Sequence, residues 1–395
     1  MTVRRESSPH SLYPVPQCHR KKGHPLLMHK RSITTASTCV MLLLAGCSSQ
    51  SDAGSSEPGP SGGASQTATA ASTRESYISG AVRPEDLVSV PGTPWVLVSG
   101  MASAKLGTAG HLYSVNTDVG LPAEVWPTTN QQIEWDPSTY PGCPGPPDAT
   151  EPHGINVRAD EGQPPVLYAI NHKRESVEVF RIDATTDIVG LIWTGCIPLP
   201  HNVYANGIAA LPEGGLALTS MYDPTEPGNP FERMFTGKDT GQVLTWHRDS
   251  GWAPVPSSGL GGANGIAVTP DGRSIIAAAW TQKKVVRLPL DGSGERSEAT
   301  VPFLPDNLRW TTNGTVLVTG QDISADDIMT CNGGEGTDCP TGYTVVEINP
   351  DTMASTVLHD EPDSPFSLAT TALPVADEIW VGSIAGDKIA RVSGT

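Results

Sequence analysis

The chain of 395 residues carries 25 Lys and Arg against 42 Asp and Glu, a net charge of −17. Seven of the basic residues and one of the acidic residues lie in positions 1–47, so positions 48–395 carry 25 − 7 = 18 basic and 42 − 1 = 41 acidic side chains, or −23. Such an acidic body repels nucleic acid and anionic membrane surfaces, which argues against both as partners. The 41 Gly and 36 Pro favour many short strands and tight turns over long helices.

Residues 1–47 predict an N-terminal extension followed by a lipoprotein signal peptide. Lys30 and Arg31 precede an apolar stretch that is too short for a permanent membrane span. The stretch ends in the tetrapeptide LAGC, which resembles the bacterial lipobox and would make Cys47 the lipidated first residue of the mature protein. An ordinary cleaved signal is the alternative. We therefore expect export to the bacterial cell envelope, with the lipid anchor on the outer face of a membrane as the only membrane contact.

Two further boundaries follow from composition. Residues 1–27 hold several prolines and scattered basic residues, which is not typical of a leader, so Met28 is the expected true start. Residues 48–77 are rich in Ser, Gly, Ala and Thr and cannot bury a core, which predicts a disordered tether. Residues 78–395 form the expected folded domain.

One β-hairpin sequence pattern recurs along this domain. In Ala263–Trp280, two apolar runs flank a Pro-Asp-Gly turn, which predicts two antiparallel strands joined by that turn. Asn206–Leu218 has nearly the same pattern, and looser copies begin at Glu85, His153, Asp306 and Ser367.

The spacing of the six copies indicates the architecture. The copies start at 85, 153, 206, 264, 306 and 367, so that successive intervals are 68, 53, 58, 42 and 61 residues. Repeats of this length with about four strands each are typical of propeller blades, which must stack around an axis because one blade cannot bury both of its faces. The sequence thus predicts an all-β, six-bladed β-propeller, with a β-sandwich as the alternative. Two long insertions, 126–148 and 223–241, are expected to border the axial mouth.

Four cysteines follow the predicted lipidation site. An even number in an exported domain favours disulfides. Cys331 and Cys339 bracket a Gly-rich loop and are expected to pair locally, which leaves Cys143 to pair with Cys196. Because no Cys-x-x-Cys pair is present, zinc and redox chemistry receive little support.

The blade starts share polar side chains. If each copy opens with the strand that lines the axis, its first residue points to the same place. Carboxylate and amide oxygens gathered there are hard ligands that suit Ca²⁺, and a cation would offset the cost of burying them. The alternative is that each Asn-Gly pair only caps a turn. The residues concerned are Glu85, Asn206, Asn264, Asp306 and Asn307, together with His153.

Several short motifs follow one another along the domain: Glu85-Asp86-Leu87, Pro152-His153-Gly154-Ile155, Ile170-Asn171-His172, Ala263-Asn264-Gly265-Ile266 with Pro270-Asp271-Gly272, and Asp306-Asn307. In order and approximate spacing they resemble the motifs of the paraoxonases, and the chain also resembles the wider senescence-marker-protein-30/gluconolactonase group. The resemblance covers roughly residues 80–392 and implies a six-bladed propeller with an axial catalytic calcium ion.

The resemblance also implies site residues. Carried over by position, the catalytic calcium ion would be held by the five blade-start ligands named above. A second, structural calcium ion would use Asp86 and the backbone carbonyl of Ile155. The chain departs from the family pattern at Gly207, where an acidic residue is expected, and around Gln321, where a histidine is expected.

Paraoxonases use a histidine pair, which matches His153 and His172. The implied activity is hydrolysis of a lactone or aryl ester: calcium polarises the carbonyl, His153 activates water and His172 tunes or relays the proton. Two alternatives remain open: a sugar-lactone hydrolase of the gluconolactonase type that does not need the histidine pair, and a lipid-tethered binding propeller in which calcium is structural. For a lone histidine, a purely structural role would be the better interpretation.

Overall fold

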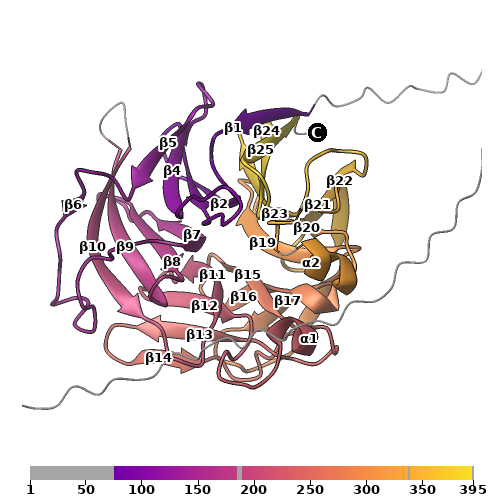
Figure 1. Cartoon of the computed structure of the whole chain (residues 1–395). Coiled ribbons are helices and arrows are strands. Elements are labelled where there is room, and N and C mark those ends of the chain that lie inside the picture. The colour runs from indigo at the N-terminus through magenta and orange to yellow at the C-terminus, as the bar shows by residue number, and fades with distance from the viewer. Residues whose placement is uncertain (1–74, 185–188, 332, 337–338, 394–395) are drawn as a thin grey trace, which may run out of the picture. The chain divides into compact units, whose positions relative to one another are not determined.

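Six sheets, antiparallel except for the pairing of a short fifth strand in one of them, form a closed ring (Figure 1). The structure, a computed structural model, describes residues 75–184, 189–331, 333–336 and 339–393. The predicted start at Met28, the lipidation site at Cys47 and the tether up to residue 74 lie outside the described residues. The prediction of an all-β, six-bladed propeller is confirmed.

Four strands in sequence order from the axis outward form each of blades 1 to 5, and blade 2 has a fifth strand at its outer edge. Blade 1 contains β2 (Pro84–Ser89), β3 (Trp95–Gly100), β4 (His111–Asn116) and β5 (Pro122–Trp126). Blade 2 contains β7 (Pro152–Arg158), β8 (Val166–Asn171), β9 (Ser176–Asp183) and β10 (Gly190–Pro198), with β6 (Gln132–Ile133) at its outer edge. Blade 3 contains β11 (Ala205–Ala210), β12 (Leu216–Ser220), β13 (Gln242–His247) and β14 (Gly251–Pro254). Blade 4 contains β15 (Ala263–Val268), β16 (Ser274–Ala279), β17 (Lys284–Pro289) and β18 (Ser297–Thr300). Blade 5 contains β19 (Leu304–Trp310), β20 (Val316–Gln321), β21 (Tyr343–Ile348) and β22 (Ser355–Glu361).

Blade 6 closes the ring with a strand from the other end of the chain. It contains β23 (Ala369–Val375), β24 (Glu378–Ser383) and β25 (Lys388–Ser393), and its outermost strand is β1 (Ser76–Ser79), which pairs antiparallel with β25. In Figure 1 the indigo β1 accordingly lies beside the yellow β24 and β25. This pairing joins the first described strand to the last blade and so closes the ring. Ser76 and Tyr77, which sequence analysis assigned to the tether, therefore belong to the propeller.

The repeated hairpin pattern forms the two innermost strands of the blades. β15 and β16 pair antiparallel around the Asp271-Gly272 turn, as predicted. The apolar side chains of the inner strands pack between neighbouring blades; one cluster joins Ala209 and Ala217 of blade 3 to Ile266 and Ile275 of blade 4. Burial between blades explains why these strands are apolar on both faces.

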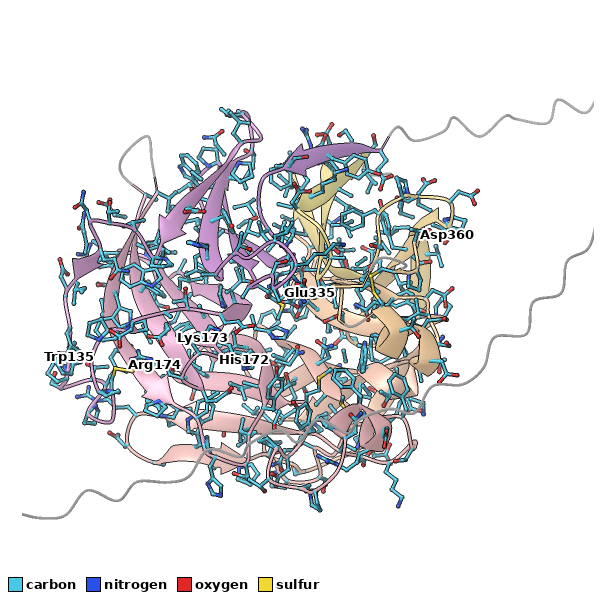
Figure 2. The ribbon with its side chains drawn as sticks, in the orientation of Figure 1. Trp135, His172, Lys173, Arg174, Glu335 and Asp360 are labelled. Carbon is cyan, nitrogen blue, oxygen red and sulfur yellow. A yellow bond between two sulfur atoms is a disulfide. The ribbon has the colours of Figure 1, made fainter. Side chains whose placement is uncertain are left out.

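In the part of the chain that the structure describes, three short helices lie in the loops: α1 (Pro230–Met234), the 3₁₀ helix η1 (Trp280–Gln282) and α2 (Ala325–Cys331). Within the described residues, none has the length and apolar character needed to cross a membrane. The insertion 223–241 carries α1 to the axial mouth, as expected. The insertion 126–148 instead contributes β6, which pairs with the outer strand β10, and Trp135 lies at the periphery in Figure 2.

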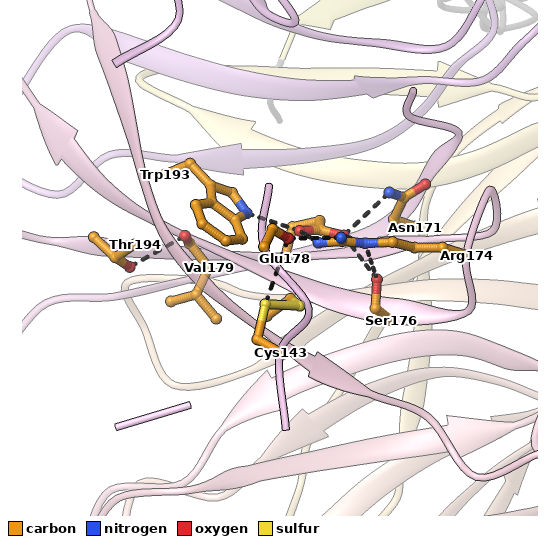
Figure 3. The surroundings of a disulfide bond; sticks show 10 residues. Cys143, Asn171, Arg174, Ser176, Glu178, Val179, Trp193 and Thr194 are labelled. Carbon is orange, nitrogen blue, oxygen red and sulfur yellow. Dashed lines mark hydrogen bonds and ion pairs between the residues drawn. A yellow bond between two sulfur atoms is a disulfide. The ribbon is translucent and has the colours of Figure 1, made fainter. Parts of the chain in front are cut away.

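Both predicted disulfides are present, Cys143–Cys196 and Cys331–Cys339. The first fastens the loop before β7 to β10, beside the buried carboxylate of Glu178 (Figure 3). Glu178 accepts hydrogen bonds from Arg174 and from the indole of Trp193, at 2.6 and 2.8 Å to its Oε2. Arg174 also donates to the Gly145 carbonyl at 2.7 Å, so the same cluster holds the loop and the turn between β8 and β9.

Candidate active site and cation site

Each innermost strand is interrupted by a β-bulge at its first residues. In β15, Ala263 pairs with Ala279 and Ile266 pairs with Ala277, so Asn264 and Gly265 together face one residue of β16. The same shift follows Pro84, Pro152, Ala205, Pro305 and Ala369. A bulge re-aims a side chain out of the regular alternation. It therefore explains how each blade start presents its polar residue to the axis.

The glycine after the ligand residue allows adjacent inner strands to approach closely. A Cβ on Gly154 would lie 2.1 Å from the backbone oxygen of Asn206, and one on Gly265 would lie 2.5 Å from that of Asp306. Both contacts are far inside the van der Waals limit, so no side chain fits. The Asn-Gly pairs at 206 and 264 lie in strand bulges rather than in turns, and turn capping does not explain them.

Four of the predicted ligands leave a buried oxygen without a hydrogen-bond partner. Side chains from blades 1, 3, 4 and 5 border one central pocket of about 270 Å³. All four are at most 5% exposed. Unpaired buried oxygens are rare in folded proteins because their desolvation is not offset. The atoms are Glu85 Oε2, Asn206 Oδ1, Asn264 Oδ1 and Asp306 Oδ1.

Burial and mutual repulsion act on the two carboxylates of this set. Burial, followed by the nearby charges of Asp86 and Asp306, raises the pKa of Glu85 well above its ordinary value. Burial is also the largest cause that raises the pKa of Asp306 to about 7, against the lowering by its hydrogen bond from Gln321. Without a cation the site therefore favours the protonated carboxyl groups.

This donor set fits a hard divalent cation. The described residues contain no cluster of three or more His, Cys, Asp or Glu side chains that could hold a metal ion. A cation here would therefore depend on two amide oxygens in addition to the two carboxylates, which is the all-oxygen chemistry that Ca²⁺ accepts.

Asn307, the fifth predicted ligand, and Gln321 brace the carboxylates. The amide nitrogen of Asn307 donates to Glu85 Oε1 at 2.7 Å. Gln321 donates to Asp306 Oδ2 at 2.7 Å and accepts from the indole of Trp280 at 2.9 Å. Both contacts leave the second carboxylate oxygen free. Gln321 stands where the resemblance implied a histidine, so its role could be found only from the structure.

The predicted histidine pair lies in contact at the edge of the pocket. His153 Nδ1 is 3.1 Å from His172 Nε2, and Figure 2 places His172 near the centre of the ring. Asn206 Nδ2 lies 3.3 Å from His153 Nε2, which makes this nitrogen the acceptor. Burial first, then His172 and Arg83, hold the pKa of His153 well below its usual range. His153 is therefore neutral at pH 7, and its unprotonated Nε2 faces the amide nitrogen of the predicted ligand Asn206.

The residues implied for a second metal ion are occupied by a guanidinium group. Arg309 donates to the Asp86 carboxylate and, at 3.1 Å, to the carbonyl oxygen of Ile155. It also donates to the carbonyl of Leu87 at 2.6 Å. Asp86 Oδ2 accepts the N–H of Ile155 at 2.9 Å. The second-metal prediction stays a prediction, but both of its oxygens already have a cationic donor.

Sequence analysis missed the wall of the pocket. It is mainly apolar and aromatic, and its members come from the end of β12 and from the short helices α1, η1 and α2. The wall contains Met221, Tyr222, Phe231, Trp280 and Ile328.

Comparison with known proteins agrees with the fold. No family model matches the chain. A segment of 82 residues is 35% identical to the strictosidine synthase-like protein 10 of Arabidopsis thaliana; the match covers 20% of this chain and only 22% of that protein. A luciferin-regenerating enzyme aligns over 82% of this chain and 95% of its own at 13% identity, with a TM-score of 0.50. A candidate gluconolactonase aligns over 82% and 93% at 14% identity, with a TM-score of 0.49. At 13% identity, the likeness to the luciferin-regenerating enzyme shows the fold alone.

Proposed function

We propose that this propeller is a calcium-dependent hydrolase of lactones or aryl esters. The observation that carries the proposal is the set of four buried oxygens, one from each of four blades, that lack partners beside a contacting histidine pair. Folding alone explains neither feature. The four oxygens are buried without hydrogen-bond partners, and the histidine pair lies at the edge of a cavity.

The cation would be held by Glu85, Asn206, Asn264 and Asp306, with Asn307 and Gln321 as braces. A bound calcium ion would supply polarisation of the substrate carbonyl and stabilisation of its oxyanion. The protein's own part is to keep these oxygens dry and convergent. Glycines at the bulges and the closed ring do this without side-chain rearrangement.

His153 is placed to act as the general base. Its unprotonated Nε2 accepts a hydrogen bond from Asn206 and lies 3.6 Å from Glu85 Oε1, next to the ligand set. It would take a proton from a water molecule that attacks the carbonyl carbon, while its Nδ1–H stays hydrogen-bonded to His172. Tyr204 stacks on the His172 ring with centroids 4.5 Å apart, which keeps that ring in its plane.

The apolar wall supports an apolar substrate over a sugar lactone. Trp280 and Phe231 form an edge-on aromatic pair with centroids 6.4 Å apart, and Met221 and Ile328 line the same cavity. A polyhydroxylated aldonolactone would leave its hydroxyl groups without partners against this surface. An aryl or alkyl group matches it.

Detergent-purified full-length protein tests the proposal. We expect turnover of phenyl acetate and of an alkyl-substituted lactone with Ca²⁺, little turnover of an aldonolactone, and loss of activity with a chelator. His153→Gln should lower kcat/KM by about 10²- to 10⁴-fold, whereas the matched control His111→Gln, remote from the ligands, should not. Aldonolactone turnover that survives His153→Gln would favour the gluconolactonase type. Calcium-loaded protein that is inert toward all three substrates would favour a binding propeller.

We also propose export with a lipid anchor on Cys47. The two disulfides fit an oxidising compartment. Cys47→Ser should move the protein from the membrane fraction to the soluble exported fraction, and an unchanged membrane fraction would contradict the anchor.

A further inference from the structure

The turn that carries His172 is held rigidly from several sides. Asn171 Oδ1 accepts the N–H groups of Glu151 and Lys173, both at 3.0 Å, and Asn171 Nδ2 donates to Glu178 Oε1 at 3.1 Å. Arg174, two residues after His172, is clamped on the same Glu178 (Figure 3). The backbone around His172 is thus fixed before any substrate binds.

Glu175 ends this turn in an unusual conformation. Its φ is +49°, a region that residues other than glycine seldom adopt. Its carboxylate oxygens lie 3.2 and 3.3 Å from His172 Nδ1. The side chain of His172 is 6% exposed and that of Glu175 is 43% exposed, so the carboxylate caps the outer nitrogen of a buried ring.

These contacts determine where the protons sit. An ionised carboxylate only accepts hydrogen bonds, so His172 Nδ1 must donate to Glu175. His172 Nε2 is then an acceptor and receives the Nδ1–H of His153. His153 Nε2 is left as an acceptor, which agrees independently with the amide nitrogen of Asn206 beside it. In this chain of hydrogen bonds, every donor therefore points away from the pocket and toward Glu175.

We propose that Glu175 is a positioning residue that holds His172 in its Nδ1–H tautomer. When water attacks the carbonyl carbon, its proton goes to His153 Nε2. The Nδ1 proton of His153 can pass to His172 Nε2, and the resulting imidazolium faces the negative charge of Glu175. The kinetic part of this inference rests on the proposed hydrolase function, whereas the tautomer of His172 does not.

Three substitutions separate the roles of Glu175. Glu175→Ala removes both acceptor and charge, Glu175→Gln keeps an acceptor oxygen without the charge, and Glu175→Asp keeps the charge on a shorter stem. Glu151→Ala is the matched control, because that carboxylate contacts Lys173 at 3.3 Å and not the imidazole. Melting curves of all four proteins check that they fold.

The decisive measurement is ¹⁵N NMR of histidine-labelled protein, with the His172 signals assigned by His172→Gln. We expect the Nδ1–H form in the wild type, in Glu175→Gln and in Glu175→Asp, and mixed tautomers in Glu175→Ala. An unchanged His172 tautomer in Glu175→Ala would overturn the proposal, whatever the activity.

Kinetics supply the second measurement. We expect Glu175→Ala to lower kcat by about 10- to 100-fold with KM nearly unchanged, less than for a fully buried triad carboxylate. Glu175→Asp should recover most of the rate, and Glu151→Ala should match the wild type. Normal kcat in Glu175→Ala would overturn the relay. A wild type inert toward every ester would refute the proposed function and leave the NMR result to decide the role of Glu175.

Discussion

Glu85 and Asp86 are neighbours in β2, are both buried and meet opposite electrostatic surroundings. Asp86 is neutralised by the chain itself, through Arg309 and the N–H groups of Ile155 and Leu87. Glu85 has one oxygen bound to Asn307 and the other unpartnered. The two adjacent buried carboxylates therefore differ: Asp86 has a cationic partner within the chain, whereas Glu85 lies at the proposed cation site.

The largest effect should come from removing the unpaired carboxylate. Glu85→Ala deletes a charged ligand from the proposed cation site, so we expect Ca²⁺ affinity to fall by more than about 100-fold and turnover to be lost. Calorimetric titration and elemental analysis measure both affinity and stoichiometry. The wild type should bind one ion at the axis. Two tightly bound axial ions would break the comparison, since Asp86 would then also need metal.

Breaking the internal pair should destabilise the fold instead. Arg309→Met leaves the buried Asp86 uncompensated and should cost about 3–5 kcal/mol in urea unfolding, with or without Ca²⁺. The double variant Arg309→Met with Asp86→Leu should regain much of that loss, because it removes both charges. If added Ca²⁺ fully restored the single variant, the two positions would be interchangeable rather than distinct.

A smaller loss of affinity should follow when the brace is removed. Asn307→Ala keeps the Glu85 carboxylate but frees it to rotate, and we expect Ca²⁺ affinity to fall by about 10- to 100-fold. The same titration measures it. A loss as large as that of Glu85→Ala would indicate that Asn307 is itself a ligand, as the sequence predicted.

The smallest expected effect is a pH dependence of stability that comes from a buried carboxyl group with an unpartnered oxygen. The pKa of Asp306 is raised to about 7 by burial. The stability that its proton provides to calcium-free protein is present below its ordinary pKa near 4 and is lost as the pH rises through about 7. The difference in Tm between calcium-loaded and dialysed protein should therefore widen between pH 5 and pH 8. A constant difference would contradict the burial of an uncompensated carboxyl group.

Local sequence was sufficient to locate the blades. The hairpin pattern around Pro270-Asp271-Gly272 specifies two strands and their turn. Because it depends only on residues close together in the chain, it could be recognised at each copy. The disulfide partners followed from cysteine count and loop spacing. The polar residue at each blade start was visible for the same reason.

Other features depend on contacts between distant parts of the chain. Ring closure by β1 pairs Ser76 with Arg391, and no local pattern marks a four-residue strand as the partner of the last blade. In the sequence, nothing distinguishes Arg309 from other basic residues. Its role depends on its contact with Asp86, 223 positions away. Glu175 likewise gains a role only when the turn aims it at a buried imidazole.

The amino-acid order alone thus determined the repeated strands, the turns and the kind of side chain at each blade start, because these depend on residues close together in the chain. The tertiary structure alone decided which oxygens stay unpaired, which carboxylate is neutralised and which nitrogen of His153 is unprotonated. These properties arise only where the closed ring brings separate blades within hydrogen-bonding distance.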